Sequence, residues 1–411
     1  MRNFRFYGDF WIWVVFFVLS AVSIVEVYSA GSFLTLKEGN IFSPLFNHGS
    51  FLLASAVLAL AIHHVPCRIF KLIPLTCGIP VIGLLVYVLL WGKNLNNGAR
   101  WLSIMGISFQ PSELAKIVLI VFVALTLATS QGKRGASKAA FWSILIFTGI
   151  VSGLIVTQNF STAALIGLVI FLMLIVGRAP KKLMFGFVLS VLVSGGLAFA
   201  SLMALPSDPH DPFYDSKFTQ RLSTWRARLT DKSMVVTPDP RDFELNDRNR
   251  QVVNARIALA SAQGTGRAPG RSVQRDYLSA AYSDFIFAII GEELGLLGCA
   301  IVVAAYMLLL YRAKRIASQC EHNFPAFLIM GLALMIVTQA VINMCVAVGL
   351  FPVTGQTLPL VSKGGTSTII TGIYFGMMLS VSRYARRKGE KPLAAVAEEE
   401  TPELAAAYTA N

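Results

Sequence analysis

Long apolar segments separated by short polar connections occupy the chain from residue 10 to residue 382. Segments of about 17 residues or more can span the roughly 30 Å hydrocarbon core of a bilayer. We expect about ten spans, each a helix, because a helix satisfies all its backbone polar groups internally. The sequence therefore predicts an all-α polytopic membrane protein. The expected spans are 10–30, 48–65, 72–91, 112–129, 141–157, 161–177, 183–205, 284–311, 324–348 and 364–382.

Composition agrees with this prediction. The chain is 55% hydrophobic and 14% charged, with a mean hydropathy of +0.64, whereas a soluble protein has roughly 25% charged residues. The net charge of +13 could suggest nucleic-acid binding, but the basic residues are distributed between the spans. We therefore expect no nucleic-acid partner. The five cysteines show no CxxC spacing, which argues against a disulfide framework or a zinc site.

The distribution of Lys and Arg predicts the orientation. With the N-terminus in the cytoplasm, the short inner connections and the two ends contain 18 basic residues and the short outer loops contain 4. The positive-inside rule then places both termini in the cytoplasm. The long connection 206–283, between the seventh and eighth spans, becomes a large extracytoplasmic loop. We expect one membrane domain, 1–388, and a disordered cytoplasmic tail, 389–411, that is rich in Ala and Glu.

Three carboxylates lie in the apolar stretch YSDFIFAIIGEELGLLG. Acidic groups inside a membrane are costly, so a functional role is the default interpretation. Asp284 is predicted at the outer water–lipid boundary, where it could meet an external substrate or act only as a helix N-cap. Glu292 and Glu293 lie deeper, and we expect them to be structural hydrogen-bond partners between helices.

The stretch NNGARWLSIMGISFQPSELAK holds a second group of candidates. Pro111 suits the first turn of a helix, and Glu113 and Lys116 share one helix face as a possible ion pair. The pair could line a substrate site or be a buried structural pair. Arg100, in the preceding outer loop, could bind an anionic head group with its planar guanidinium or be a surface arginine.

Three further segments are predicted at the outer face. In GLFPVTGQTLPLVSKGGTST, irregular backbone is tolerated only inside protein or beside a wet cavity. Its N–H groups could bind phosphate or form a plain re-entrant turn. TQNFSTA supplies Gln158, and GTGRAPGRSVQRDY supplies arginines that could bind phosphate or be solvated. The substrate-binding candidates in these segments are Gln158, Arg271, Arg275, Ser362, Lys363, Gly364 and Gly365.

NGARWLSI, FQPSELAK, SDFIFAIIGEELGLLG and GQTLPLVSKGGTST together resemble the SEDS family (shape, elongation, division and sporulation) over nearly the whole chain. The resemblance implies a ten-span glycosyltransferase in the bacterial inner membrane that polymerises lipid II. It implies a class B penicillin-binding transpeptidase and other divisome membrane proteins as partners. LPLVS and GRSVQ favour the FtsW-like division branch over the RodA-like elongation branch.

The resemblance also assigns roles to residues. It implies that Asp284 is the catalytic general base and that Arg100, Glu113 and Lys116 belong to the substrate site. It places Pro111, Ser112 and Pro359 in supporting positions, together with Glu292 and Glu293. Lys363, Asn159 and Tyr282 depart from the family pattern. No cofactor is certain, although a divalent cation, Mg or Mn, could assist departure of the diphosphate.

Two other function classes are compatible with parts of the sequence. A transporter or flippase could carry a lipid-linked precursor across the bilayer, and a scaffold could recruit the transpeptidase without chemistry. The candidate residues gather on the outer side without an inner counterpart, which argues against alternating access. Incubation of the purified protein with labelled lipid II separates the three classes.

Overall fold

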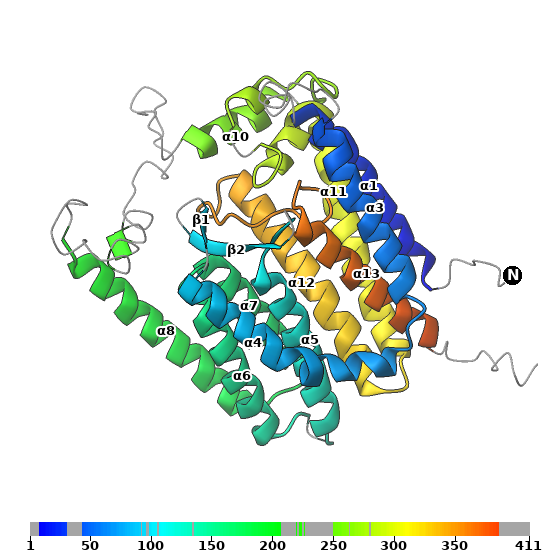
Figure 1. The fold of residues 1–411 in the computed structure, drawn as a ribbon, viewed down its shortest axis with the longest axis vertical. Helices are drawn as coiled ribbons and strands as arrows, with labels where there is room; N and C mark the ends of the chain where they lie inside the picture. Colours follow the sequence, from blue (N-terminus) through cyan, green and yellow to red (C-terminus); the bar gives the residue numbers. More distant parts are fainter. Residues whose placement is uncertain are drawn as a thin grey trace, which may run out of the picture.

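The computed structural model shows a bundle of long helices with a smaller cap at one end (Figure 1). It describes residues 8–30, 43–91, 93–95, 98–104, 107–133, 135–206, 219, 222, 223, 226, 250–262, 264–278 and 281–385. The predicted tail 389–411 and most of the 206–249 segment lie outside the described residues. The helices are α1 (Phe10–Ala30), α3 (Ser43–Ile62), the 3-10 helix η1 (Cys67–Leu72), α4 (Ile73–Trp91), α5 (Pro111–Ser130), α6 (Lys138–Val156), α7 (Phe160–Val176), α8 (Lys181–Ala204), α10 (Arg250–Ser261), the 3-10 helix η5 (Gln274–Asp276), α11 (Ile286–Gln319), α12 (Asn323–Ala347) and α13 (Thr366–Tyr384).

Each of the ten predicted apolar segments coincides with a helix, and the polytopic helical fold is confirmed. Seven described helices, with η1 and α4 taken together, are long and apolar enough to cross a membrane. Phe46–Ile62 and Phe160–Val176 are shorter apolar helices. The exact number of spans and their orientation remain predictions.

A small antiparallel sheet between α4 and α5 was not expected. It has the order β1 (Lys93–Leu95), β2 (Gly98–Ile104) and β3 (Ile107–Phe109). We call the end of the bundle that carries α10, this sheet and residues 349–365 the cap end. The opposite end, with η1 and the turns 131–137 and 177–180, is the basic end (Figure 1).

The core is formed mainly by α5, α12, α13 and the first part of α11. Helix α13 packs closely on α3 through two glycines four residues apart. A Cβ at Gly372 would lie 2.3 Å from Ser55 Oγ, and one at Gly376 would lie 3.0 Å from the Ala59 Cα. Small residues at this spacing allow two membrane helices to approach closely, which gains van der Waals contact.

The two ends of the described chain meet at the basic end. The Asp9 N–H donates to Ser382 Oγ at 2.9 Å, and the Asp9 carboxylate forms an ion pair with Arg312. Asp9 also accepts from the Trp11 N–H at 3.0 Å, so it caps α1. These bonds join α1, α11 and α13 and place both described chain ends on the same side, as the predicted topology requires.

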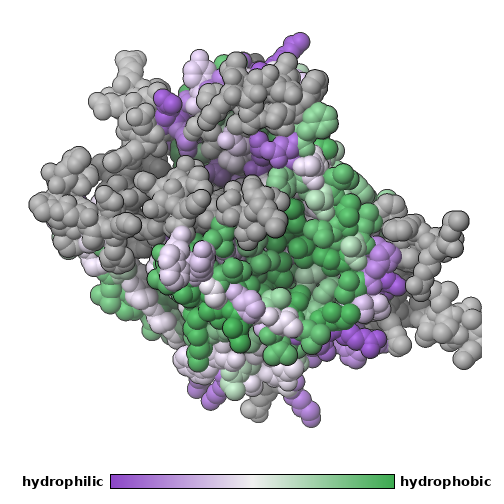
Figure 2. All heavy atoms as spheres, in the orientation of Figure 1, coloured by the Kyte–Doolittle hydropathy of each residue, from purple (hydrophilic) through white to green (hydrophobic). Residues whose placement is uncertain are grey.

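The outer surface has the distribution expected for a lipid environment. In Figure 2, hydrophobic residues cover the middle of the visible face and hydrophilic ones gather toward the edges. Helix α8 is the extreme case, since none of its residues is buried and it diverges from the bundle (Figure 1). Exposed apolar side chains on its surface include Phe185, Leu192 and Leu197.

Candidate active site

Three of the segments that the sequence singled out meet at the cap end. They are the first turn of α5, the irregular connection 349–365 between α12 and α13, and the turn that precedes α11. Proline and glycine prevent 349–365 from continuing either helix, so its backbone folds back between them. The result is a layer of polar groups above the apolar core.

Asp284 lies at the mouth of this layer and is partly exposed. Helix α11 begins at Ile286, its N-cap is Phe285, and no side chain caps it, so the N-cap alternative for Asp284 is not realised. The Asp284 carbonyl accepts from Asn343 Nδ2 at 2.9 Å, and the same amide donates to the Gln356 carbonyl at 2.7 Å. A Cβ added to Gly355 would lie 4.0 Å from Asp284 Oδ2, so the 349–365 backbone passes directly beside the carboxylate.

The segment 349–365 is bonded to the chain immediately before Asp284. Ser362 Oγ donates to the Ser283 carbonyl at 2.5 Å and accepts from the Leu358 N–H at 2.8 Å. The Lys363 N–H donates to the Tyr282 carbonyl at 2.9 Å, and the Lys363 ammonium lies 5.5 Å from the centre of the Tyr282 ring. A cationic side chain therefore contacts Tyr282, which precedes the candidate base by two residues.

The predicted row of phosphate-binding N–H groups is only partly available. The N–H groups of Ser362 and Lys363 are occupied by the carbonyls of Leu358 and Tyr282. Ser362 is also 1% exposed, so its hydroxyl is structural. Among the described residues, the N–H groups of Gly364 and Gly365 have no backbone partner. Gly365 precedes α13 with φ 53°, where a side chain would be strained.

The Glu113–Lys116 ion pair is connected to the 349–365 segment through Gln339. Lys116 Nζ lies 2.7 Å from Glu113 Oε1 and donates to Gln339 Oε1 at 3.0 Å. Gln339 Nε2 then donates to the Thr357 carbonyl at 2.9 Å. Lys116 is 0% exposed and Glu113 is 8% exposed. The geometry thus favours the buried structural alternative over direct substrate contact, because neither charge reaches the surface.

The first turn of α5 fits its predicted local structure. Pro111 is the first helical residue, where its missing N–H costs nothing. Ser112 is 6% exposed, and its hydroxyl has no hydrogen-bond partner among the described residues.

The carbonyl of Pro359, another supporting candidate, accepts from the buried Tyr306 hydroxyl at 2.6 Å. This bond anchors 349–365 to the middle of α11.

Glu292 and Glu293 form more hydrogen bonds to the loop before α11 than to neighbouring helices. Glu292 accepts from the N–H groups of Val273 at 3.0 Å and Gln274 at 3.3 Å, and from the Ser272 hydroxyl at 2.5 Å. Glu293 accepts from the Ser272 N–H at 3.1 Å. Further bonds to these two carboxylates come from Ser261 of α10, Gly270 of the loop and Ser29 of α1. We call the two glutamates and residues 264–274 the loop clasp.

Glycine makes the loop clasp sterically possible. Gly295 has φ 65° and ψ −160°, which breaks the helical path of α11. The Leu296 N–H there donates to the Gly264 carbonyl at 3.0 Å. A Cβ on Gly266 would lie 2.4 Å from the Glu293 carbonyl, and one on Gly295 would lie 2.6 Å from the Gly264 carbonyl. Only glycine allows this backbone crossing.

The loop arginines differ in what they contact. Arg275 donates to the Ser29 carbonyl at 3.2 Å and to the Gly270 carbonyl at 3.0 Å, which ties the loop to α1. Arg271 is exposed, and its N–H bonds to the Ala268 carbonyl at 3.2 Å. Of the two candidate arginines in this loop, Arg271 is therefore the one whose side chain is presented to solvent.

Three more residues that the sequence singled out lie in other elements of the chain. Gln158 Nε2 donates to the Leu85 carbonyl at 3.5 Å, near the ends of α4 and α6. Asn159 is the N-cap of α7 and accepts from the Thr162 N–H at 3.3 Å, which gives this departure from the family pattern a local structural role. Arg100 belongs to β2, and its side chain lies outside the described residues.

Sequence reasoning missed the polar residues that connect these parts. Gln339 and Asn343 lie one turn apart on α12 and bind both 349–365 and Asp284. Two amides at that spacing in an apolar helix are a signal that could have revealed them. Glu26 of α1 was also missed. It is 0% exposed, and neither carboxylate oxygen has a hydrogen-bond partner among the described residues.

Comparison with known proteins matches this arrangement to one family. The family model of FtsW, RodA and SpoVE cell cycle proteins matches residues 9–387. The chain is 30% identical over 380 residues to a probable peptidoglycan glycosyltransferase FtsW of Geobacter sp. (strain M18), covering 90% of this chain and 95% of that protein. It is also 30% identical over 398 residues to the protein of the same name from Halomonas elongata, covering 94% and 93%.

Solved structures share the fold. A structure of a peptidoglycan synthase complex, described as coordinating polymerization and crosslinking, superposes with a TM-score of 0.69 at 22% identity, covering 92% of this chain and 99% of that one. The rod shape determining protein RodA of Thermus thermophilus superposes with a TM-score of 0.62 at 22% identity, covering 92% and 98%.

Proposed function

The chain belongs to the FtsW/RodA/SpoVE family of cell cycle proteins, and from this premise we propose that it is a peptidoglycan glycosyltransferase. It polymerises lipid II into glycan strands on the outer face of the bacterial cytoplasmic membrane, and its FtsW-named relatives favour septal wall synthesis. One observation carries the proposal. Asp284 is partly exposed at the cap end, where Asn343 bonds to its carbonyl, Ser362 bonds to the carbonyl of Ser283, and Gly355 lies beside its carboxylate.

The proposed reaction needs one base and no protein nucleophile. The 4-hydroxyl of the acceptor sugar gives its proton to Asp284 as its oxygen attacks the anomeric carbon of the donor. The bond from that carbon to the diphosphate breaks, and undecaprenyl diphosphate leaves with the bonding electrons. A single displacement at an α-linked donor gives a β-linked product. A positioned base contributes about 10²–10⁴ in rate.

The leaving diphosphate requires positive charge or N–H donors as its own charge develops. Lys363 lies next to the turn that carries Asp284, and Gly364 and Gly365 present N–H groups at the start of α13. Arg271 is presented by the loop clasp. No group of three or more metal-binding side chains occurs among the described residues. Asp284 could supply one carboxylate to a divalent ion, with the diphosphate supplying other ligands.

A class B penicillin-binding transpeptidase is the partner that we propose for this enzyme. The support is the fold shared with the peptidoglycan synthase complex, in which polymerization and crosslinking are coordinated. We therefore expect the activity to be measured best with such a transpeptidase present.

The decisive experiment replaces Asp284 by Asn. Purified Asp284→Asn protein is incubated with labelled lipid II and a transpeptidase partner. Its polymerisation rate should be about 10²–10⁴-fold lower than that of the wild type, because asparagine cannot accept the proton. Asp276→Asn is the matched control, since Asp276 lies in the same loop with a side chain that is 59% exposed. Polymerisation retained by Asp284→Asn would contradict the assignment. Movement of lipid II between liposome leaflets without polymer would instead identify a transporter.

A further inference from the structure

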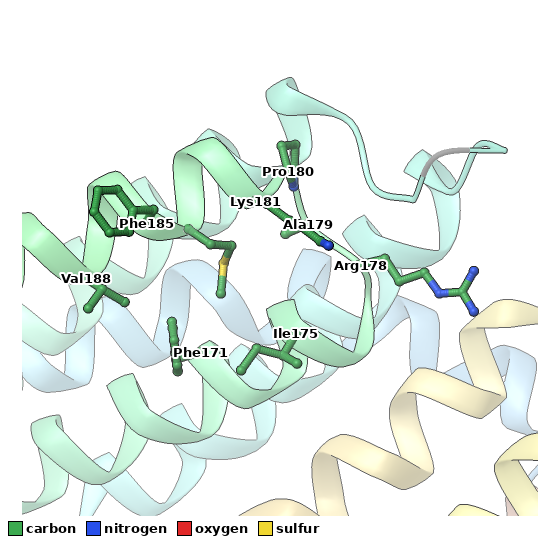
Figure 3. Close-up of a pocket in the computed structure, with 9 residues that line it drawn as sticks. Phe171, Ile175, Arg178, Ala179, Pro180, Lys181, Phe185 and Val188 are labelled. Atoms are coloured by element: carbon green, nitrogen blue, oxygen red, sulfur yellow. The ribbon is translucent and has the colours of Figure 1, made fainter.

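A crevice at the basic end lies far along the helices from Asp284 and has no role in the proposed reaction. It is about 790 Å³ in volume and lies between the end of α7 and the start of α8. Figure 3 shows Phe171 and Ile175 of α7 facing Phe185 and Val188 of α8 across it. The volume is within the usual range of small-molecule sites, about 300–1,000 Å³.

Basic side chains stand at one end of this apolar crevice. Arg178 and Lys181 line it at the turn that joins the two helices. In Figure 3 the Arg178 guanidinium extends outward from the rim, away from the apolar side chains. The crevice thus has a cationic end and an apolar interior, which matches the head group and acyl chain of an anionic lipid.

Arg178 occupies a backbone position that favours glycine. The bonds from the Ala179 N–H to the Leu174 carbonyl and from the Arg178 N–H to the Ile175 carbonyl close the end of α7 in a Schellman motif. Arg178 takes the left-handed residue of that motif, with φ 52°. A glycine there would cost less conformational energy, although a cation is favoured at the C-terminal end of a helix.

Lys181 is also in an unfavourable place for local structure. It is the first residue of α8, whose N-cap is Pro180, and no side chain caps this end. The first turn of α8 contains no acidic residue. The N-terminal end of a helix carries partial positive charge and leaves N–H groups unsatisfied, so it favours an anion over a cation.

We propose that this crevice binds one anionic phospholipid of the leaflet at the basic end. The phosphate lies at the start of α8 between Arg178 and Lys181, and an acyl chain lies between Phe171 and Phe185. A bound phosphate neutralises both cations and accepts from the uncapped N-terminal end of α8. Basic pockets between membrane helices are known to accept anionic head groups.

The test measures retention of phosphatidylglycerol on the purified full-length chain by native mass spectrometry, with phosphatidylcholine as the neutral comparison. We expect the wild type to retain phosphatidylglycerol preferentially. The Arg178→Gly/Lys181→Gln double variant should bind it about 30-fold more weakly, because each cation near an anionic head group contributes about fivefold. The glycine also relieves the backbone at residue 178, so the variant should fold normally.

Two further variants make the result specific. Lys138 is the first residue of α6 at the same end, exposed but on a helix capped by Ser137, so Lys138→Gln should retain full binding. Ile175→Trp fills the crevice from a residue that is 53% exposed and should reduce binding while keeping both cations.

Several outcomes would overturn the proposal. Equal loss in Lys138→Gln would mean nonspecific attraction to a basic surface, and equal retention of phosphatidylcholine would mean bulk lipid only. Full binding by Ile175→Trp would place the lipid outside the crevice. Dimers that exclude phosphatidylglycerol would assign the crevice to a second copy of the chain.

Discussion

Replacing Glu292 by Gln should release the loop clasp while changing almost no volume. In the wild type, Glu292 Oε1 accepts from the Val273 N–H and Oε2 accepts from the Gln274 N–H. Glutamine has one acceptor oxygen and one NH₂ group, so one of these backbone N–H groups must face another donor. The serine hydroxyls that also bond to Glu292 can reorient, but the backbone cannot.

The cost follows from these contacts. An unsatisfied buried N–H costs about 1–3 kcal/mol, and the remaining bonds lose the strength that the charge gave them. A total of about 2 kcal/mol or more is expected, because Glu292 is 0% exposed and water cannot replace the lost bonds. This corresponds to roughly 30-fold faster amide exchange for residues 270–274, if exchange proceeds by opening of the loop.

Hydrogen exchange followed by mass spectrometry of loop peptides measures this effect. Peptides from α12 should exchange as in the wild type, which separates loop release from global unfolding. Glu321→Gln is the matched control, since Glu321 is exposed in the turn before α12 at the basic end. Unchanged exchange of residues 270–274 in Glu292→Gln would refute the conclusion that this carboxylate holds the loop.

Two more predictions follow from the same layer of structure. Gly266→Ala should lower the thermal stability of the protein more than Gly270→Ala does. Both glycines have positive φ, but only a Cβ at Gly266 would lie against backbone atoms. Equal effects would mean that the backbone strain of a side chain at positive φ is the only cost. Lys116→Met should lower stability by about 3–5 kcal/mol because it leaves Glu113 unpaired in the interior. The Glu113→Gln/Lys116→Met double variant should recover much of that loss, and a double variant as unstable as the single one would contradict a simple pair.

The helices could be predicted from sequence because the bilayer imposes their length and apolarity. Their ends were less predictable. Helix α11 continues to Gln319, beyond the expected residue 311, because Arg312 pairs with Asp9 and so remains packed against α1. The sheet between α4 and α5 was missed because two of its strands have only three residues each, too short for a recognisable alternation.

The site was predicted as a set of residues but not as a set of contacts. Lys363 is brought to the turn that carries Asp284 by its bond to Tyr282, a contact between residues far apart in sequence. Glu292 and Glu293 bond to a loop that crosses α11 at Gly295. Helical spacing alone could not predict these hydrogen-bond partners. From its sequence position, Lys116 could bind substrate. Only its burial shows that it holds the 349–365 backbone instead, through Gln339.

The break at Gly295 divides α11 into two mechanically different parts. Residues 286–294 are attached to the loop 264–274 by the glutamate bonds, whereas residues 296–319 continue toward the basic end. A displacement of residues 264–274 would therefore load residues 286–294 directly, because the glutamate bonds join them to the loop. On the function proposed above, a protein that docks on this loop would act on the Asp284 end of α11 before it acts on the longer part.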